Sequence, residues 1–256
     1  MTDTSLTAAV VLIGDEILSG RTQDVNLKQI ADFLTPLGIP VKECRTVPDV
    51  EEEIVAAVNA LRARYTYVFT TGGIGPTHDD ITADSIGAAF GVEVEEHPEI
   101  IALLAERYKS VGREFTTASR RMARVPKGAK LVKNTATGAP GFRMDNVFIL
   151  AGVPSIAQAM LQAVGPELET GAVVHSVTVR GRGAVESDIA EGLSALADEV
   201  KDVSLGSYPW FKTMEDRGVN LVARSTDEAL LQTVSERMMA LFARAGIDAE
   251  RLPGNG

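Results

Sequence analysis

Cysteine is nearly absent from this sequence of 256 residues, in which Cys44 is the only one. A single cysteine excludes an intramolecular disulfide and a metal site built from clustered cysteines. Cys44 falls in the middle of a predicted strand, where we expect it to be a small core residue.

Long apolar runs are also missing. No stretch reaches the roughly 18 residues that a membrane-spanning helix needs. The first residues, MTDTSLT, lack the basic segment of a secretory signal peptide. We therefore expect a soluble, cytoplasmic protein with no membrane association.

Basic residues are scarce relative to acidic ones. Lys and Arg together number 25 and Asp and Glu 35, so the formal net charge is −10 at pH 7. Proteins that bind nucleic acids or anionic membranes neutralise phosphate with an excess of basic side chains, so we expect neither partner. Hydrophobic residues make up 45% and charged residues 23% of the chain, which is an ordinary globular composition and excludes disorder.

Short apolar runs alternate with amphipathic helical patterns along the first two thirds of the chain. The predicted strands span residues 8–13, 41–46, 67–70 and 147–150, and the predicted helices include residues 81–90 and 97–124. The first run is continuously apolar, as is typical of a strand buried on both faces. The alternation predicts an α/β fold with a mostly parallel sheet between two layers of helices.

The pattern changes at residues 165–171, a stretch that contains Gly165, Pro166 and Gly171. Glycine and proline at this density favour a loop, so we place a domain boundary there. The following elements are predicted in the order β-α-β-β-α, which is typical of a small α+β subdomain. The predicted domains are residues 1–168 and 169–256.

The most unusual stretch comes directly after the predicted strand 67–70 and spans residues 71–82, TGGIGPTHDDIT. Its glycines would let backbone N–H groups approach a ligand that a Cβ atom would keep away. The carboxyl ends of parallel strands, followed by helix N-termini, favour phosphate binding. The loop is neither a Walker motif nor Gly-x-Gly-x-x-Gly. The alternative is a tight strand-to-helix turn, and the glycines alone do not separate these two interpretations.

Two adjacent acids, Asp79 and Asp80, follow the glycines. One of them could cap the next helix while the other projects over the glycine loop. Carboxylates beside a phosphate-binding loop indicate a divalent cation, Mg²⁺ by preference, whose coordination shell the substrate phosphates would complete.

Other turns fall at the same predicted edge of the sheet. Asp15 and Glu16 follow the first strand, and solvated loop acids are the alternative for them. Asp49 opens the helix after the second strand, where a role as its N-cap is the alternative. Glycine clusters at residues 137–142 and 151–155 flank the last strand of the sheet. Converging turns of this kind favour a long polyanionic ligand.

A local excess of basic residues lies between Arg113 and Lys133. We expect these side chains to form a solvated helix face, from which an arginine could reach a substrate phosphate.

Several of these segments together resemble the molybdopterin-binding (MoaB/Mog) domain. They are residues 14–20 (GDEILSG), Asp24 with Asn26, residues 70–82 and residues 138–142 (GAPGF). Within that family the form Gly-Pro-Thr-x-Asp-Asp of residues 75–80 is similar to the N-terminal part of CinA-like proteins (competence/damage-inducible protein A). Residues 151–154 read AGVP where the family usually has Pro-Gly-x-Pro. The remainder is similar to the extra subdomain of CinA-like proteins and to the corresponding domain of eukaryotic FAD synthase.

The resemblance implies a Mog-type fold with a ligand cleft built from these loops. In Mog relatives, residues matching Asp49 and Asp80 are associated with adenylyl transfer to molybdopterin. CinA-like and FAD-synthase-linked members are associated with metal-dependent hydrolysis of the pyrophosphate bond in ADP-ribose or FAD. The amidase domain of full-length CinA has no counterpart here, so we expect no amidase activity. Relatives are dimers or trimers, so we expect a homo-oligomer.

The leading hypothesis is a nucleotide pyrophosphohydrolase that uses Mg²⁺ or another divalent cation. The alternatives are a molybdopterin-binding or adenylating protein and a non-catalytic nucleotide-binding protein. Asp80 and Asp49 are the expected catalytic residues, and the expected metal ligands are Asp80 with Asp79 or Glu16. The residues expected to bind phosphate or substrate are Gly14, Asp15, Asn26, Thr71, Gly72, Gly73, Gly75, Pro76, Thr77, Thr82, Gly138, Pro140, Gly141, Gly152 and Pro154.

Overall fold

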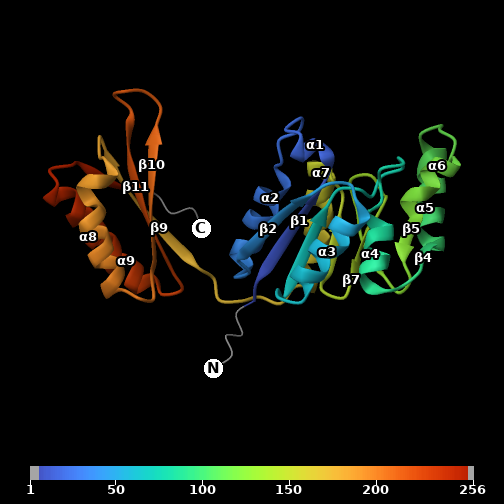
Figure 1. Cartoon of the computed structure of the whole chain (residues 1–256), viewed down its shortest axis with the longest axis horizontal. Coiled ribbons are helices and arrows are strands. Elements are labelled where there is room, and N and C mark those ends of the chain that lie inside the picture. Colours follow the sequence, from blue (N-terminus) through green and yellow to red (C-terminus); the bar gives the residue numbers. More distant parts are fainter. Residues whose placement is uncertain (1–5, 253–256) are drawn as a thin grey trace. The chain divides into compact units, whose positions relative to one another are not determined.

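A computed structural model describes residues 6–252, and the chain divides into two compact units (Figure 1). The first unit ends at Gly171 and the second begins at Ala172. Within the described range, no helix is both long and apolar enough to cross a membrane.

The first unit contains a six-stranded sheet with a parallel centre. Parallel pairs join β2, β1, β3 and β8, whereas β7 and β6 extend one edge with antiparallel pairs. In spatial order the strands are β2 (Val41–Val47), β1 (Ala8–Ile13), β3 (Tyr67–Thr71), β8 (Val147–Leu150), β7 (Gly141–Met144) and β6 (Lys130–Val132). The mostly parallel sheet is confirmed. The β6–β7 hairpin is an addition, because the glycine cluster beside β7 predicted only a loop.

Helices cover both faces of this sheet, which confirms the three predicted layers (Figure 1). One face carries α2 (Asn26–Leu34) and α7 (Pro154–Val164), and the other carries α3 (Glu51–Arg62) and α4 (Thr82–Phe90). The helix α5 (Pro98–Ser110) extends the second of these hydrophobic layers beyond α4. In β1, Val10 packs toward α2 and α7, while its neighbour Val11 packs toward α3 and α4. Both are fully buried, and each such side chain contributes roughly 1.5–3 kcal/mol of transfer free energy. The central strands are therefore apolar at every position.

Residues 97–124, predicted to be helical with polar interruptions, are helical over only part of that range. After α5, Gly112 takes the left-handed conformation (φ +67°), which ends a helix readily. The backbone N–H of Ser119 then donates to the Thr116 hydroxyl at 3.2 Å and begins a new turn. The remaining elements of this segment are α6 (Thr117–Arg120), the 3₁₀ helix η2 (Arg121–Ala123) and β5 (Arg124–Pro126), which pairs with β4 (Val94–Glu96).

Cys44 is exposed and not part of the core, which contradicts the prediction. It lies on β2, the edge strand, where the side chains of Lys42, Cys44 and Thr46 alternate with half-buried neighbours. An edge strand packs less of its surface than a central one, so an apolar sulfur there reaches solvent.

The second unit is a four-stranded antiparallel sheet with two helices on one of its faces (Figure 1). Its elements are β9 (His175–Arg182), α8 (Glu186–Glu199), β10 (Ser204–Phe211), β11 (Arg217–Ser225), α9 (Glu228–Arg244) and β12 (Ala249–Leu252). Phe242 of α9 and Val179 of β9 are fully buried between helices and sheet. The predicted β-α-β-β-α order is confirmed, and β12 adds one edge strand.

Candidate functional site

The glycine loop lies at the carboxyl end of β3, between β1 and β8. Gly72 and Gly73 have φ values of +105° and +65°, which L side chains rarely adopt. A Cβ atom at Gly72 would collide with the carbonyl oxygen of Ile13 at the end of β1. The N–H of Gly72 donates to the carbonyl of Leu150 in β8 at 3.3 Å. These glycines are therefore required for packing between the ends of three strands.

Thr82, the first residue of α4, is hydrogen-bonded to the glycine loop. Its hydroxyl donates to the carbonyl of Gly72 at 2.9 Å, and its backbone N–H donates to the carbonyl of Gly73 at 3.0 Å. Thr82 is fully buried. Its role is thus to shape the loop and not to contact a ligand.

The carboxylate of Asp80 folds back over the same loop. Oδ2 of Asp80 accepts hydrogen bonds from the backbone N–H of Thr77 (2.7 Å) and from the Thr77 hydroxyl. A Cβ atom on Gly75 would lie 2.6 Å from that oxygen, so glycine makes room for the carboxylate. The prediction that one of the two acids caps α4 is wrong, because Ile81 occupies the N-cap and no side chain caps the helix.

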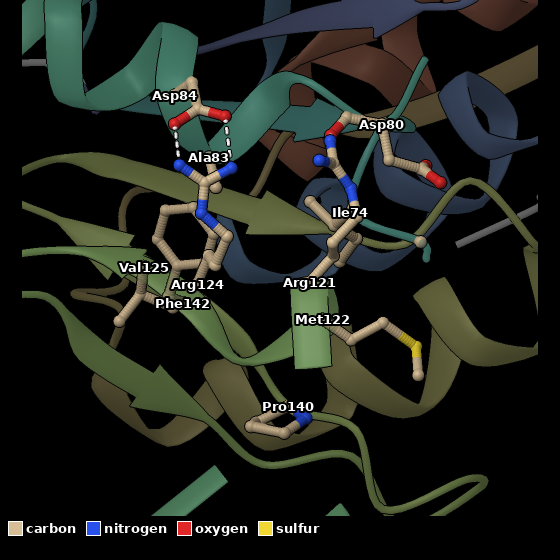
Figure 2. A pocket seen from close by; sticks show the side chains of 12 residues that line it. Ile74, Asp80, Ala83, Asp84, Arg121, Met122, Arg124, Val125, Pro140 and Phe142 are labelled. Atoms are coloured by element: carbon tan, nitrogen blue, oxygen red, sulfur yellow. Dashed lines mark hydrogen bonds and ion pairs between the residues drawn. The ribbon is translucent and has the colours of Figure 1, made fainter. Parts of the chain in front are cut away.

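Arg121 connects this turn to the segment after α5. Its guanidinium donates from Nε to the carbonyl of Thr77 (3.1 Å) and from Nη2 to the carbonyl of Asp80 (3.3 Å). Figure 2 shows the guanidinium against the backbone of Asp80. Nearby, Arg124 forms two hydrogen bonds with Asp84 of α4, at 2.8 and 2.6 Å, which fix η2 and β5 against that helix (Figure 2). Arg121, a member of the basic cluster, therefore contacts the turn that carries Asp80, and it does so by hydrogen bonds to backbone carbonyl groups.

Asp49 does not cap α3, whose N-cap is Val50 without a side-chain hydrogen bond. Instead, Oδ2 of Asp49 accepts from the backbone N–H of Asp15 at 2.9 Å. Partial burial raises the pKa of Asp49, and the nearby carboxylates of Asp15, Glu16 and Asp79 add to this effect. The helix α1 (Asp15–Leu18) and its acids are therefore tied to the end of β2.

A cavity of about 550 Å³ opens beside these turns. Of the predicted site residues, nine line it: Glu16, Gly72, Gly73, Gly75, Pro76, Asp80, Pro140, Gly152 and Pro154. The turns after β1 and β3, the loop before β7 and the turn after β8 therefore do meet at one cavity.

The other predicted residues lie outside its wall: Gly14, Asp15, Asn26, Asp49, Thr71, Thr77, Asp79, Thr82, Gly138 and Gly141. Several of them support the wall. The Asn26 amide donates to the carbonyl of Gly152 at 2.8 Å, and a Cβ atom on Gly141 would collide with the carbonyl of Ile149 in the neighbouring strand.

Part of the cavity wall was not among the predicted binding residues: Thr22, Ile74, Met122, Asn134, Thr137, Ala139, Ala151, Val153, Ile156 and Met160. Ile74 and the members of residues 137–142 and 151–155 do fall within segments predicted to meet at this edge of the sheet, whereas the others do not. Asn134 shapes the loop before β7, because its amide donates to the carbonyl of Ala139 at 2.7 Å and accepts from the N–H of Ala136 at 2.9 Å. The only feature of the sequence that could have pointed to Asn134 is its position a few residues before the glycine cluster. Met122 carries no signal at all, since only the tertiary fold brings η2 to the cavity.

Residues 9–170 match the protein family described as "probable molybdopterin binding domain". This match covers more than half of the sequence. The chain belongs to the molybdopterin-binding-domain family. Residues 174–251 match a second family, described as "FAD synthase, middle domain".

Relatives of this molybdopterin-binding-domain protein include CinA-like proteins. One from Citrifermentans bemidjiense is 39% identical over 226 residues, which are 85% of this chain and 53% of that protein. A protein from Pyrobaculum arsenaticum is 38% identical over 252 residues, 92% of this chain and 94% of its own length. The chain thus spans about half the length of the CinA-like relative (53%) but nearly all of the archaeal one.

The crystal structure of the protein CinA with unknown function from Thermoplasma acidophilum has the same fold as the first unit. Its TM-score is 0.58 at 30% identity, covering 64% of this chain and 98% of that one. The Mog-type α/β fold that the motifs imply is therefore confirmed.

Proposed function

We propose that this protein is a metal-dependent pyrophosphohydrolase that cleaves the diphosphate of a nucleotide such as ADP-ribose or FAD. The observation that carries the proposal is the single cavity that joins the loop Gly72–Pro76 to the carboxylates of Glu16 and Asp80. The match to a family of FAD synthase middle domains supports a nucleotide-processing role.

The loop has the donors that a phosphate needs. Gly73 and Gly75 contribute backbone N–H groups that make no hydrogen bond to any other described residue, unlike Gly72, whose N–H donates to Leu150. Both N–H groups are therefore available to donate to a phosphoryl oxygen.

The negatively charged side chains that line the cavity indicate that a cation binds there together with the substrate. Glu16 and Asp80 are its only ionisable side chains among the described residues, and both are acidic. A diphosphate beside two carboxylates would be repelled unless a positive charge lay between them. A divalent cation fits this donor set, because Mg²⁺ and similar ions are bound by one or two carboxylates, water and substrate phosphates.

This assignment favours Glu16 over Asp79 as the partner of Asp80. Asp79 does not line the cavity, and no group of three His, Cys, Asp or Glu side chains in residues 6–252 forms a complete metal site. Oδ2 of Asp80 is held by Thr77, which leaves Oδ1 for the cation. Asp49 would act as a positioning residue for α1, which carries Glu16.

The size and the apolar part of the cavity suit a nucleotide. A volume of about 550 Å³ lies in the range of small-molecule sites. Ile74, Met122, Ile156 and Met160 supply apolar surface for a planar ring. A single metal ion or inorganic phosphate would use only one side of such a cavity.

In the proposed reaction a water oxygen attacks one phosphorus of the diphosphate, and the bond from that phosphorus to the bridging oxygen breaks. The products are two phosphate monoesters, AMP with ribose 5-phosphate from ADP-ribose or AMP with FMN from FAD. A bound cation would lower the pKa of the attacking water and offset phosphoryl charge. The N–H groups of Gly73 and Gly75 would stabilise the charge that develops on the phosphoryl oxygens.

A second candidate is binding or adenylation of molybdopterin, which the family match favours. Molybdopterin also combines a ring system with a phosphate, so it would use the same cavity. A non-catalytic nucleotide-binding protein is the third candidate. Homo-oligomerisation stays a prediction.

The test incubates purified protein with ADP-ribose, with FAD, or with molybdopterin plus ATP, each with and without Mg²⁺, Mn²⁺ or Co²⁺. It measures AMP release from the first two and adenylated molybdopterin with pyrophosphate from the third. We expect metal-dependent hydrolysis of ADP-ribose or FAD that EDTA abolishes. Asp80→Asn and Glu16→Gln should each lose at least about a hundredfold in rate, whereas the matched variant Asp79→Asn should stay near wild type. Binding without turnover across the panel would overturn the proposal, and adenylated molybdopterin as the product would favour the second candidate.

A further inference from the structure

The sheet of the second unit has one face that its helices do not cover. Side chains of a strand alternate between the two faces of a sheet. Val179 of β9 and Leu221 of β11 belong to the core beneath α8 and α9. Their neighbours Arg180 and Asn220 lie on the opposite face, in register with each other.

Two aromatic side chains of β10 lie on this open face. Tyr208 pairs in register with Asn220, and Trp210 pairs with Gly218. The Tyr208 ring lies over Gly206, where a Cβ atom would be 2.8 Å from the ring. Tyr208 is 46% exposed. The absence of a side chain at residue 206 therefore lets an aromatic ring lie along the strand with part of its surface in solvent.

Each of these rings has an arginine beside it. The guanidinium carbon of Arg180 is 5.1 Å from the centre of the Trp210 ring, and its Nε donates to the Asn220 amide oxygen at 3.0 Å. The guanidinium carbon of Arg224 is 5.7 Å from the centre of the Tyr208 ring, and its Nη1 donates to the Tyr208 hydroxyl at 3.2 Å. Both arginines are thus held in place by neutral groups.

The positive charge of these two arginines is not offset by an ion pair. Neither forms one with any carboxylate in the described part of the chain. Glu250 of β12, which pairs in register with Arg180 of β9, forms its ion pair with Arg182 instead, at 3.2 Å. On a protein with net charge −10, each of these ordered guanidinium groups, without an acidic partner, is available to an anion.

Trp210 adds an unused donor. Its indole Nε1 is buried and has no hydrogen-bond partner among the described residues. A buried donor without an acceptor is unfavourable, and a ligand that supplied an acceptor would remove that cost. An anionic oxygen bound to Arg180 would lie on the same side of the sheet as this N–H group.

We propose that this face binds a nucleoside monophosphate, with its base stacked on the Tyr208 ring and its phosphate paired with Arg180. Aromatic rings stack on nucleobases, and arginine binds phosphate with charge-assisted hydrogen bonds. The cavity proposed for hydrolysis is lined by residues of the first unit alone, whereas the residues of this face all belong to the second unit. This inference does not depend on hydrolytic activity.

Trp210 is the only tryptophan of the chain, so its fluorescence reports on this face alone. The experiment titrates the whole protein with AMP in the presence of EDTA, which prevents metal-dependent turnover. We expect a saturable change in emission. Adenosine, which lacks the phosphate, and ribose 5-phosphate, which lacks the base, should each bind about tenfold more weakly.

Variants distinguish a specific loss of AMP binding from a general loss of stability. Arg180→Gln and Tyr208→Ala should each weaken AMP binding about tenfold while the thermal unfolding midpoint stays within a few degrees. Arg237→Gln is the matched control, because Arg237 lies on α9 and pairs with Glu199 of α8. Its AMP affinity should equal that of wild type. Tyr208→Phe keeps the ring and should retain most of the affinity, which covers the case in which the alanine variant is poorly folded.

Three results would overturn the proposal. The first is unchanged Trp210 emission up to millimolar AMP. The second is a single-stranded oligodeoxyadenylate that binds more tightly than AMP with a steep salt dependence, which would indicate a nucleic-acid surface. The third is a dimer in analytical ultracentrifugation that Tyr208→Ala dissociates, because a second copy of the chain would then cover this face.

Discussion

The carboxylate of Asp49 accepts a hydrogen bond from the backbone N–H of Asp15 at 2.9 Å, across 34 residues of sequence. The two residues follow β2 and β1, which are adjacent parallel strands. The bond joins two neighbouring turns at the carboxyl edge of the sheet and orients α1, which carries Glu16.

The substitution Asp49→Asn should change how stability depends on pH. The amide oxygen of the new side chain would still accept from the Asp15 N–H, but the charge would be lost. Burial and nearby carboxylates raise the pKa of Asp49 above its ordinary value of 3.8, so the folded state holds the proton more tightly than the unfolded chain does. The stability that this provides is complete below the ordinary pKa and is lost as the pH rises through the raised one.

We therefore expect the free energy of unfolding of Asp49→Asn, minus that of wild type, to grow as the pH rises from below the ordinary pKa of 3.8 through the raised pKa of the folded state. Urea denaturation at several pH values measures it. Asp49→Ala, which removes the acceptor, should be less stable than Asp49→Asn at every pH by about 1 kcal/mol. A pH-independent difference between wild type and Asp49→Asn would contradict the interpretation.

Thr82→Val should destabilise the first unit by roughly 1–3 kcal/mol. It removes a hydroxyl that donates to the Gly72 carbonyl at 2.9 Å in a fully buried position, leaving that carbonyl without this donor. Thr82→Ser keeps the hydroxyl and should lose less. Chemical denaturation of both variants makes the comparison, and equal stabilities would show that the hydrogen bond is not what Thr82 contributes.

Arg121→Gln should lower the rate of AMP release by about tenfold or more, because its guanidinium holds both ends of the turn that carries Asp80. Arg120→Gln is the matched control, since Arg120 is bound to Glu96 and not to this turn. Initial rates at saturating ADP-ribose with Mg²⁺ should be unchanged for the control. If both variants kept the wild-type rate, Arg121 would have no positioning role.

The order of strands and helices was predictable from the sequence wherever neighbouring residues, such as an apolar run or a glycine cluster, determine the local structure. The apolar run of β1 predicts a doubly buried strand because every one of its side chains must avoid water. The glycines of residues 72–75 predicted either an approach of the backbone to a ligand or a tight strand-to-helix turn. The φ values of Gly72 and Gly73 and the close contact of Gly72 with Ile13 are those of a tight turn, and the approach to a ligand stays a prediction. The helical prediction for residues 97–124 was only partly right, because the turn at Gly112 lies within an otherwise continuous helical pattern.

The sequence alone determined the layered α/β fold, the glycine loop and the acids around it, since periodicity, glycine and charge act over a few residues. Tertiary structure decided the rest. Only the pairing of β1 with β2 directs Asp49 to Asp15, and only the packing of η2 brings Arg121 and Met122 to the cavity. Such contacts join residues tens of positions apart, and their geometry depends on strand register and helix packing, which no local pattern encodes.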